Sequence, residues 1–117
     1  MARIVVVDDE PSIRRLVADL LTEEGHEVLE TSNGRAAVDL VRESQPDLIL
    51  MDIMMPVLNG VDATFEIRQL EGMASVPVVL MSAIPNNHVR SMDHTAFLPK
   101  PFGITQLLSV IHRMLEH

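Results

Sequence analysis

The sequence has 117 residues, 47% of them hydrophobic and 22% charged, which are ordinary values for one globular domain. Seventeen acidic residues against nine basic ones give a net charge of −8, so nucleic acid and anionic membranes are disfavoured as binding partners. There is no cysteine, which excludes disulfides, thiolate nucleophiles and cysteine-bound zinc.

Short apolar runs and helical patterns alternate along the whole chain. The β-branched run 4–7 predicts a strand buried on both faces, and the following residues predict a helix that begins near Pro11 and ends before Gly25. The same alternation then predicts a strand at 26–30, a helix around 37–41, a strand at 48–51, a helix around 61–70, a strand at 76–81, a strand at 97–98 and a helix over 104–115.

Five strands that alternate with helices predict an α/β fold, in which one parallel sheet carries helices on both faces. Residues 85–95 fit this pattern least well, because polar side chains dominate them. We therefore expect a short or irregular fourth helix there.

The last three residues, Leu115-Glu116-His117, match the beginning of a common vector-derived histidine tag, although Leu115 also fits the helical pattern. If they are a tag remnant, the native chain can continue beyond this module. Apart from them, no boundary, repeat or low-complexity segment divides residues 1–117.

Charged and polar residues follow four of the predicted strands. Asp8 and Asp9 come after the first strand, Asp52 after the third, Ser82 after the fourth and Lys100 after the fifth. Each of them alone has a simple structural explanation, as a helix cap, a turn residue or a surface charge. Because the carboxyl ends of parallel strands meet at one edge of a sheet, we expect these five side chains to converge.

Three converging carboxylates repel one another unless a cation lies between them. An all-oxygen ligand set favours a hard ion that keeps several waters, hence Mg²⁺, with Mn²⁺ as a substitute. A metal-bound carboxylate beside an ammonium and a hydroxyl is what phosphoryl transfer to an aspartate requires.

Four motifs carry a resemblance to a known family, and they are Val7-Asp8-Asp9-Glu10, Asp52-Ile53-Met54-Met55-Pro56 with Gly60, Ser82-Ala83 and Lys100-Pro101-Phe102. The sequence resembles the receiver domain of two-component response regulators over essentially its whole length. This resemblance implies one receiver domain over residues 1–117, with a flavodoxin-like (βα)5 fold and strand order 2-1-3-4-5.

The resemblance also assigns roles at the site. Asp52 would accept a phosphoryl group from the phosphohistidine of a histidine kinase or histidine phosphotransfer protein. Asp8 and Asp9 would hold Mg²⁺ together with Asp52 and the backbone carbonyl of Met54.

Further roles follow for residues near the ends of the last two strands. Lys100 would pair with one phosphoryl oxygen and Ser82 would hydrogen-bond another. Phe97 occupies the place of the switch aromatic, whose rotamer follows that hydroxyl. Pro101 would follow a cis peptide bond.

Two departures from the family pattern have consequences. Only 18 positions separate Ser82 from Lys100, and Asp93-His94-Thr95-Ala96 replaces the usual Gly-Ala pair before the fifth strand, so coupling from Ser82 to Phe97 is open to question.

Met54 and Ile84 lie two residues after Asp52 and Ser82, and neither can orient an attacking water. We therefore expect slow self-dephosphorylation, over minutes or longer.

Three classes of function are compatible with these residues. The leading one is a phosphorylation-driven receiver that turns over no diffusible substrate and switches a downstream protein target, or a fused output domain if the chain is a fragment. The second is a receiver-like interaction module that is not regulated by phosphorylation. The third is a hydrolase with an aspartate nucleophile, which Met54 disfavours because such sites usually carry a second Asp at that position.

Location follows from what the sequence lacks. Apolar runs such as 4–7 are far too short to cross a bilayer, and no signal peptide opens the chain, so we expect a cytoplasmic protein.

Overall fold

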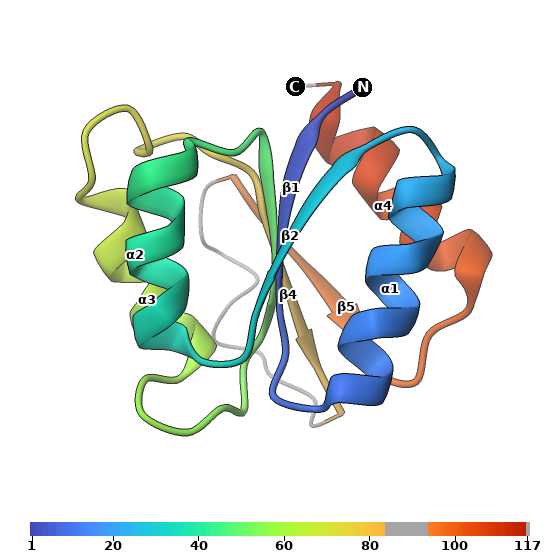
Figure 1. The fold of residues 1–117 in the computed structure, drawn as a ribbon, viewed down its shortest axis with the longest axis horizontal. Coiled ribbons are helices and arrows are strands. Elements are labelled where there is room, and N and C mark those ends of the chain that lie inside the picture. The colour runs from blue at the N-terminus through green and yellow to red at the C-terminus, as the bar shows by residue number, and fades with distance from the viewer. Residues whose placement is uncertain (84–93, 117) are drawn as a thin grey trace.

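The computed structural model describes residues 1–83 and 94–116. Its centre is a five-stranded sheet in which all neighbouring strands are parallel, in the order β2-β1-β3-β4-β5 (Figure 1). The strands are β1 (Arg3–Val7), β2 (Glu27–Thr31), β3 (Leu48–Asp52), β4 (Val78–Ser82) and β5 (Thr95–Pro99). The predicted flavodoxin-like sheet and its strand order are therefore confirmed.

Helices cover both faces of this sheet. Figure 1 shows one pair of helices on each side, with α1 and α4 opposite α2 and α3. Their bounds are α1 (Pro11–Glu23), α2 (Gly34–Ser44), α3 (Gly60–Arg68) and α4 (Ile104–Leu115). The short fourth helix predicted for residues 85–95 lies outside the described residues except at 94 and 95, which form a turn and the first position of β5. The label α4 thus belongs to the helix after β5.

The three inner strands are buried on both faces, as their continuous apolar runs predict. Every residue of β3 and β4 is buried, and in β1 only the first position is exposed. The outer strand β2 is half-buried along most of its length, because it has a neighbour on one side only. The edge position predicted for residues 26–30 is therefore confirmed.

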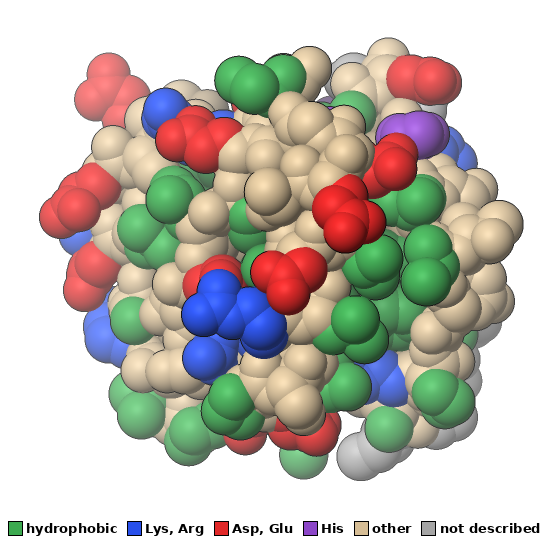
Figure 2. Space-filling view, turned by 45° about the vertical axis from the view of Figure 1, so that its right-hand side comes forward, with side chains coloured by type: hydrophobic (Ala, Val, Ile, Leu, Met, Phe, Trp, Pro, Cys, Tyr) green, Lys and Arg blue, Asp and Glu red, His purple; other side chains and the backbone are tan. Residues whose placement is uncertain are grey.

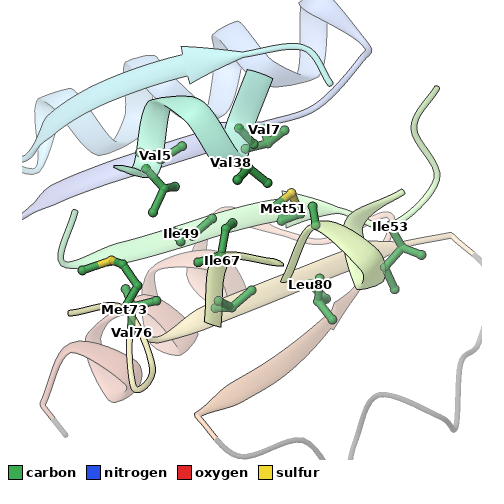
Figure 3. Packing of buried hydrophobic residues seen from close by; sticks show 14 residues of the cluster. Val5, Val7, Val38, Ile49, Met51, Ile53, Ile67, Met73, Val76 and Leu80 are labelled. Carbon is green, nitrogen blue, oxygen red and sulfur yellow. The ribbon is translucent and has the colours of Figure 1, made fainter. Parts of the chain in front are cut away.

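Side chains from alternate strand positions form two apolar clusters, one on each face of the sheet. Val5, Ile49 and Leu80 point toward α2 and α3, where they pack with residues such as Val38 and Ile67 (Figure 3). The cluster on the other face packs the intervening strand residues against α1 and α4, with the members Ile4, Val6, Leu50, Val79, Met81, Leu21, Leu107 and Ile111. Both faces are therefore closed, and the polar residues at the strand ends are left at the edge.

Helix starts follow the local sequence. Asn33 and Asn59 each accept a hydrogen bond from a backbone N–H of the helix that follows, at Ala36 and Asp62 respectively. Pro11 occupies the first turn of α1, where a missing N–H costs nothing. Among the described helices, none has the length and apolar character needed to cross a membrane.

Candidate functional site

The carboxyl ends of β1, β3, β4 and β5 bring the predicted site residues to one edge of the sheet, at the lower end of Figure 1. Asp52 and Ser82 are the last residues of β3 and β4, and Asp8 directly follows β1. Asp8, Asp52 and Ser82 are all buried, whereas most buried positions in the described chain are apolar. Polar side chains are therefore concentrated where the sequence predicted them.

The carboxylates of Asp8, Asp9 and Asp52 form a compact acidic cluster. One oxygen from each lies within 4.8 Å of the other two, with Asp8 and Asp52 buried and Asp9 exposed. Burial raises the pKa of Asp52 to about 6, and the charges of Asp8 and Asp9 act in the same direction. The charge of Lys100 and a hydrogen bond from the Met54 backbone N–H oppose this rise without cancelling it. Burial is thus the main reason why the charged form of Asp52 is disfavoured in the folded protein.

Lys100 is the cation nearest to this cluster in the described part of the chain. Its Nζ lies 3.0 Å from Asp8 Oδ2 and 3.6 Å from Asp52 Oδ2. Burial alone would lower the pKa of Lys100, but its hydrogen bond to Asp8 and the charges of Asp8 and Asp52 outweigh that effect and raise the pKa. Its backbone N–H donates to the Ser82 carbonyl at 2.9 Å, and the Lys100–Pro101 peptide bond is cis, as predicted.

Hydrogen bonds with backbone atoms hold Asp8 in place. The Asp8 N–H donates to the carbonyl of Thr31 at 3.2 Å, and Asp8 Oδ1 accepts from the Glu10 N–H at 2.9 Å. Arg14 donates from Nη1 to the Asp8 carbonyl at 2.9 Å and pairs with Glu30. Sequence reasoning missed Arg14, because its partner is a backbone atom six residues away and leaves no motif.

Gly60 brings α3 against the backbone of Asp52. A Cβ at Gly60 would lie 2.3 Å from the Asp52 carbonyl oxygen, so a side chain cannot fit unless backbone moves. The Gly60 N–H also donates to the Ile53 carbonyl at 2.9 Å. The family motif includes this glycine, and the structure supplies the physical reason for it.

Gly60→Ala is expected to destabilise the protein by about 1 to 3 kcal/mol, because the new methyl group displaces the strand end that carries Asp52. Chemical denaturation at pH 7 measures the change. Gly103→Ala is the matched control, since its Cβ would meet only the Gln106 side chain at 3.9 Å, and its cost should stay below about 1 kcal/mol. Equal costs for the two variants would contradict the close approach at Gly60.

Comparison with known proteins identifies the family to which this fold belongs. The family sequence model of the response regulator receiver domain matches residues 4–112. The chain is a receiver domain. The resemblance found in its motifs is thereby confirmed as family membership.

Individual relatives agree with this membership. PilH of Pseudomonas aeruginosa is 40% identical over 98% of each chain, and PdtaR of Mycobacterium tuberculosis is 35% identical over 93% of this chain but only 54% of its own length. A crystal structure of the receiver domain of a Pseudomonas aeruginosa sensor histidine kinase covers 99% of this chain and 98% of its own, with a TM-score of 0.87 and 28% identity. That structure holds a magnesium ion in its active-site cleft.

Two further predicted residues, Ser82 and Phe97, lie on the neighbouring strands β4 and β5. Ser82 is 3% exposed, and Phe97 pairs in register with Leu80, two residues before Ser82 on the neighbouring strand. Phe97 is half-buried and packs against the apolar cluster beneath α2 and α3. Met54 is 60% exposed beside Asp52, while Ile84 lies outside the described residues.

An apolar groove of about 360 Å³ borders the receiver site. It runs between α1 and the start of α4, and Lys100 contributes to both the groove and the acidic cluster. Leu16 and Ile104 line it and are 57% and 56% exposed, and Figure 2 shows apolar side chains gathered on this side of the receiver. Sequence reasoning did not predict the groove, because Leu16 and Ile104 fit the core-facing helical pattern.

Proposed function

We propose that this receiver domain accepts a phosphoryl group on Asp52 from the phosphohistidine of a histidine kinase or histidine phosphotransfer protein. The observation that carries the proposal is the placement of the Asp52 carboxylate. It is nearly buried at the sheet edge, clustered with Asp8 and Asp9, and 3.6 Å from the Lys100 ammonium. The chain thus combines a carboxylate nucleophile, an acidic cluster and a fixed cation in one place.

The donor set fits a divalent cation. Two buried carboxylates and an exposed one present oxygens within 4.8 Å, and their mutual repulsion contributes to the raised pKa of Asp52. We infer that Asp8, Asp9 and Asp52 hold Mg²⁺, with the Met54 backbone carbonyl as a further ligand and Mn²⁺ as a substitute ion. When bound, the ion neutralises negative charge on the phosphoryl oxygens.

Each residue of the site has its own role in the proposed phosphoryl transfer. An Asp52 oxygen attacks phosphorus in line, the O–P bond forms as the P–N bond breaks, and the imidazole leaves with the electron pair of the P–N bond. Lys100 would pair with one phosphoryl oxygen, and the Ser82 hydroxyl would donate a hydrogen bond to another. Phe97, on the strand beside Ser82, would then change its packing and alter the surface that a downstream protein recognises.

The direct test uses acetyl phosphate as the donor. Wild-type protein incubated with Mg²⁺ and acetyl phosphate should show a single added phosphoryl group by intact mass, and Asp52→Asn should show none. No adduct on wild-type protein would overturn the proposal, and so would an adduct that persists in Asp52→Asn.

The alternative function is an interaction module that does not respond to phosphorylation. The altered spacing between Ser82 and Lys100 favours it, because the segment that couples the site to the surface is short. The complete acidic cluster and the Lys100 contacts favour the phosphorylated receiver. Absence of an adduct in the same experiment would select the alternative.

The proposed output is a change in protein binding and not substrate turnover. A downstream protein, or an output domain fused to the receiver if the native chain is longer, would read the phosphorylated state. We place the protein in the cytoplasm, where a histidine kinase domain would reach it. The interpretation of residues 115–117 as a tag remnant stays a prediction.

Met54→Asn is expected to shorten the lifetime of the phosphorylated protein roughly five- to tenfold, because an amide at this exposed position can orient a water toward phosphorus. Wild-type protein should keep its phosphoryl group for minutes or longer, because the methionine side chain cannot orient water. Loss of the adduct with time, after the donor is removed, measures both rates. Met54→Leu keeps an apolar side chain and should match wild type; an equally fast loss in Met54→Leu would contradict the explanation.

A further inference from the structure

Arg68, the last residue of α3, joins three separate parts of the fold. Its Nη1 donates to the Val76 carbonyl ahead of β4. Its Nη2 lies 3.1 Å from the carbonyl oxygen of His94 and 3.1 Å from Thr95 Oγ1. One guanidinium therefore links the end of α3 to the approach to β4 and to the first residue of β5.

The residue that precedes β5 has an uncommon backbone conformation. His94 has a positive φ of 58°, a backbone conformation that non-glycine residues rarely adopt. Its carbonyl accepts from the Val78 N–H at 3.0 Å as well as from Arg68. Thr95 then begins the strand opposite Val78. Arg68 thus contacts the residues at which β5 begins.

Apolar packing alone specifies this register weakly. Phe97 packs into the cluster on one face of the sheet, and Leu98 lies in the cluster on the other. A slip of one residue would turn each of these two side chains to the opposite face, where the other apolar cluster could bury it, so burial would discriminate poorly between the two registers. β5 is also an edge strand, hydrogen-bonded to β4 only.

The register of β5 determines where Lys100 lies. Lys100 follows β5 directly, and its Nζ is 3.0 Å from Asp8 Oδ2. A slip of one residue moves the chain by about 3.3 Å, which is enough to break that contact. The short spacing from Ser82 to Lys100 makes an anchor outside the intervening segment more important in this chain.

We propose that Arg68 is a positioning residue for phosphoryl transfer, because it fixes the register of β5 and through it the placement of Lys100. The proposal rests on the proposed function of Asp52 as phosphoacceptor. Arg68 acts at the opposite end of β5 from the site and touches neither phosphoryl group nor metal ligand.

The test compares Arg68→Gln, Arg68→Lys and Thr95→Val with wild type in full-length protein. Arg68→Gln should slow phosphorylation by acetyl phosphate about tenfold, since misplacement of a reacting group by an ångström or more is costly. Affinity for Mg²⁺ should stay within about twofold, because the proposed ligands lie on β1 and β3 and the loops that follow them. Arg68→Lys and Thr95→Val, which each keep part of the contact set, should be intermediate.

Arg35→Gln is the matched control. It removes the same charge from the same side of the sheet, where Arg35 pairs with Glu66 of α3, and it should leave the rate unchanged. NMR contacts between β4 and β5 report the register independently of phosphorylation. Wild-type register and rate in Arg68→Gln would overturn the proposal, as would a parallel fall of rate and Mg²⁺ affinity. Failure of wild-type protein to form an adduct would count against the proposed function, whereas a shifted register in Arg68→Gln would still support the anchoring role.

Discussion

Asp52→Asn is expected to stabilise the metal-free protein at pH 7 by about 1 to 3 kcal/mol, although it removes the proposed phosphoacceptor. Burial beside Asp8 and Asp9 raises the pKa of Asp52 from 3.8 to about 6. A difference of about two pKa units between the folded and unfolded protein corresponds to about 3 kcal/mol at a pH above both values. The asparagine amide carries no charge, so it avoids this cost.

The pH dependence follows from the direction of the shift. Because the folded protein binds the Asp52 proton more tightly than the unfolded chain, wild type loses this stability as pH rises from about 4 to about 6. The difference between Asp52→Asn and wild type should therefore be small at pH 4, grow across that window and stay constant above it. Urea denaturation at pH 4, 5, 6 and 7 without divalent ions measures it.

Magnesium and a surface control complete this test. Mg²⁺ should stabilise wild type at pH 7 more than Asp52→Asn, because the variant lacks one of the proposed ligand charges. Asp39→Asn removes an exposed carboxylate paired with Arg42 and should change stability by less than about 1 kcal/mol at every pH. A destabilised Asp52→Asn, or a stability difference that does not narrow at low pH, would contradict the electrostatic account of the site.

Much of the fold and the site was predictable, because both depend on local patterns. Buried parallel strands appear as continuous apolar runs, and residues such as Asp52 that directly follow them must lie at one edge of the sheet. β5 was predicted only as residues 97–98, because the half-buried Thr95 and Ala96 of this edge strand carry little apolar signal.

The remaining features depend on contacts between segments that are distant in sequence. Arg68 reaches backbone and hydroxyl oxygens 8 to 27 residues away, and the sequence carries no motif for such bonds. Gly60 was recognised as part of a motif, but its distance from the Asp52 carbonyl could be known only from the fold. Exposure of Leu16 likewise depends on how far apart α1 and α4 lie, which helical periodicity does not determine.

Leu16→Glu is expected to slow phosphotransfer from a phosphorylated histidine kinase roughly thirtyfold while leaving phosphorylation by acetyl phosphate nearly unchanged. The groove between α1 and α4 exposes Leu16 and Ile104 and shares Lys100 with the acidic cluster, so under the proposed function a protein that presents a phosphohistidine to Asp52 would approach beside it. Exposed apolar surface of this kind is typical of protein interfaces. A charge buried unpaired at the centre of an interface costs about 2 kcal/mol or more, which corresponds to roughly thirtyfold.

Phe65→Glu provides a control of matched exposure and charge. Phe65 is 57% exposed, as Leu16 is, but it lies on α3, on the opposite face of the sheet. The Phe65→Glu variant should be phosphorylated by acetyl phosphate and by the kinase at rates close to those of wild type. Acetyl phosphate needs no docking surface, and the kinase would dock on the face that carries α1 and α4. Equal losses with both donors in Leu16→Glu would indicate damage to the site itself. An unchanged rate of phosphotransfer from the kinase to Leu16→Glu would show instead that the groove is not the docking surface. The kinase would then reach Asp52 without contacting the groove, as acetyl phosphate does.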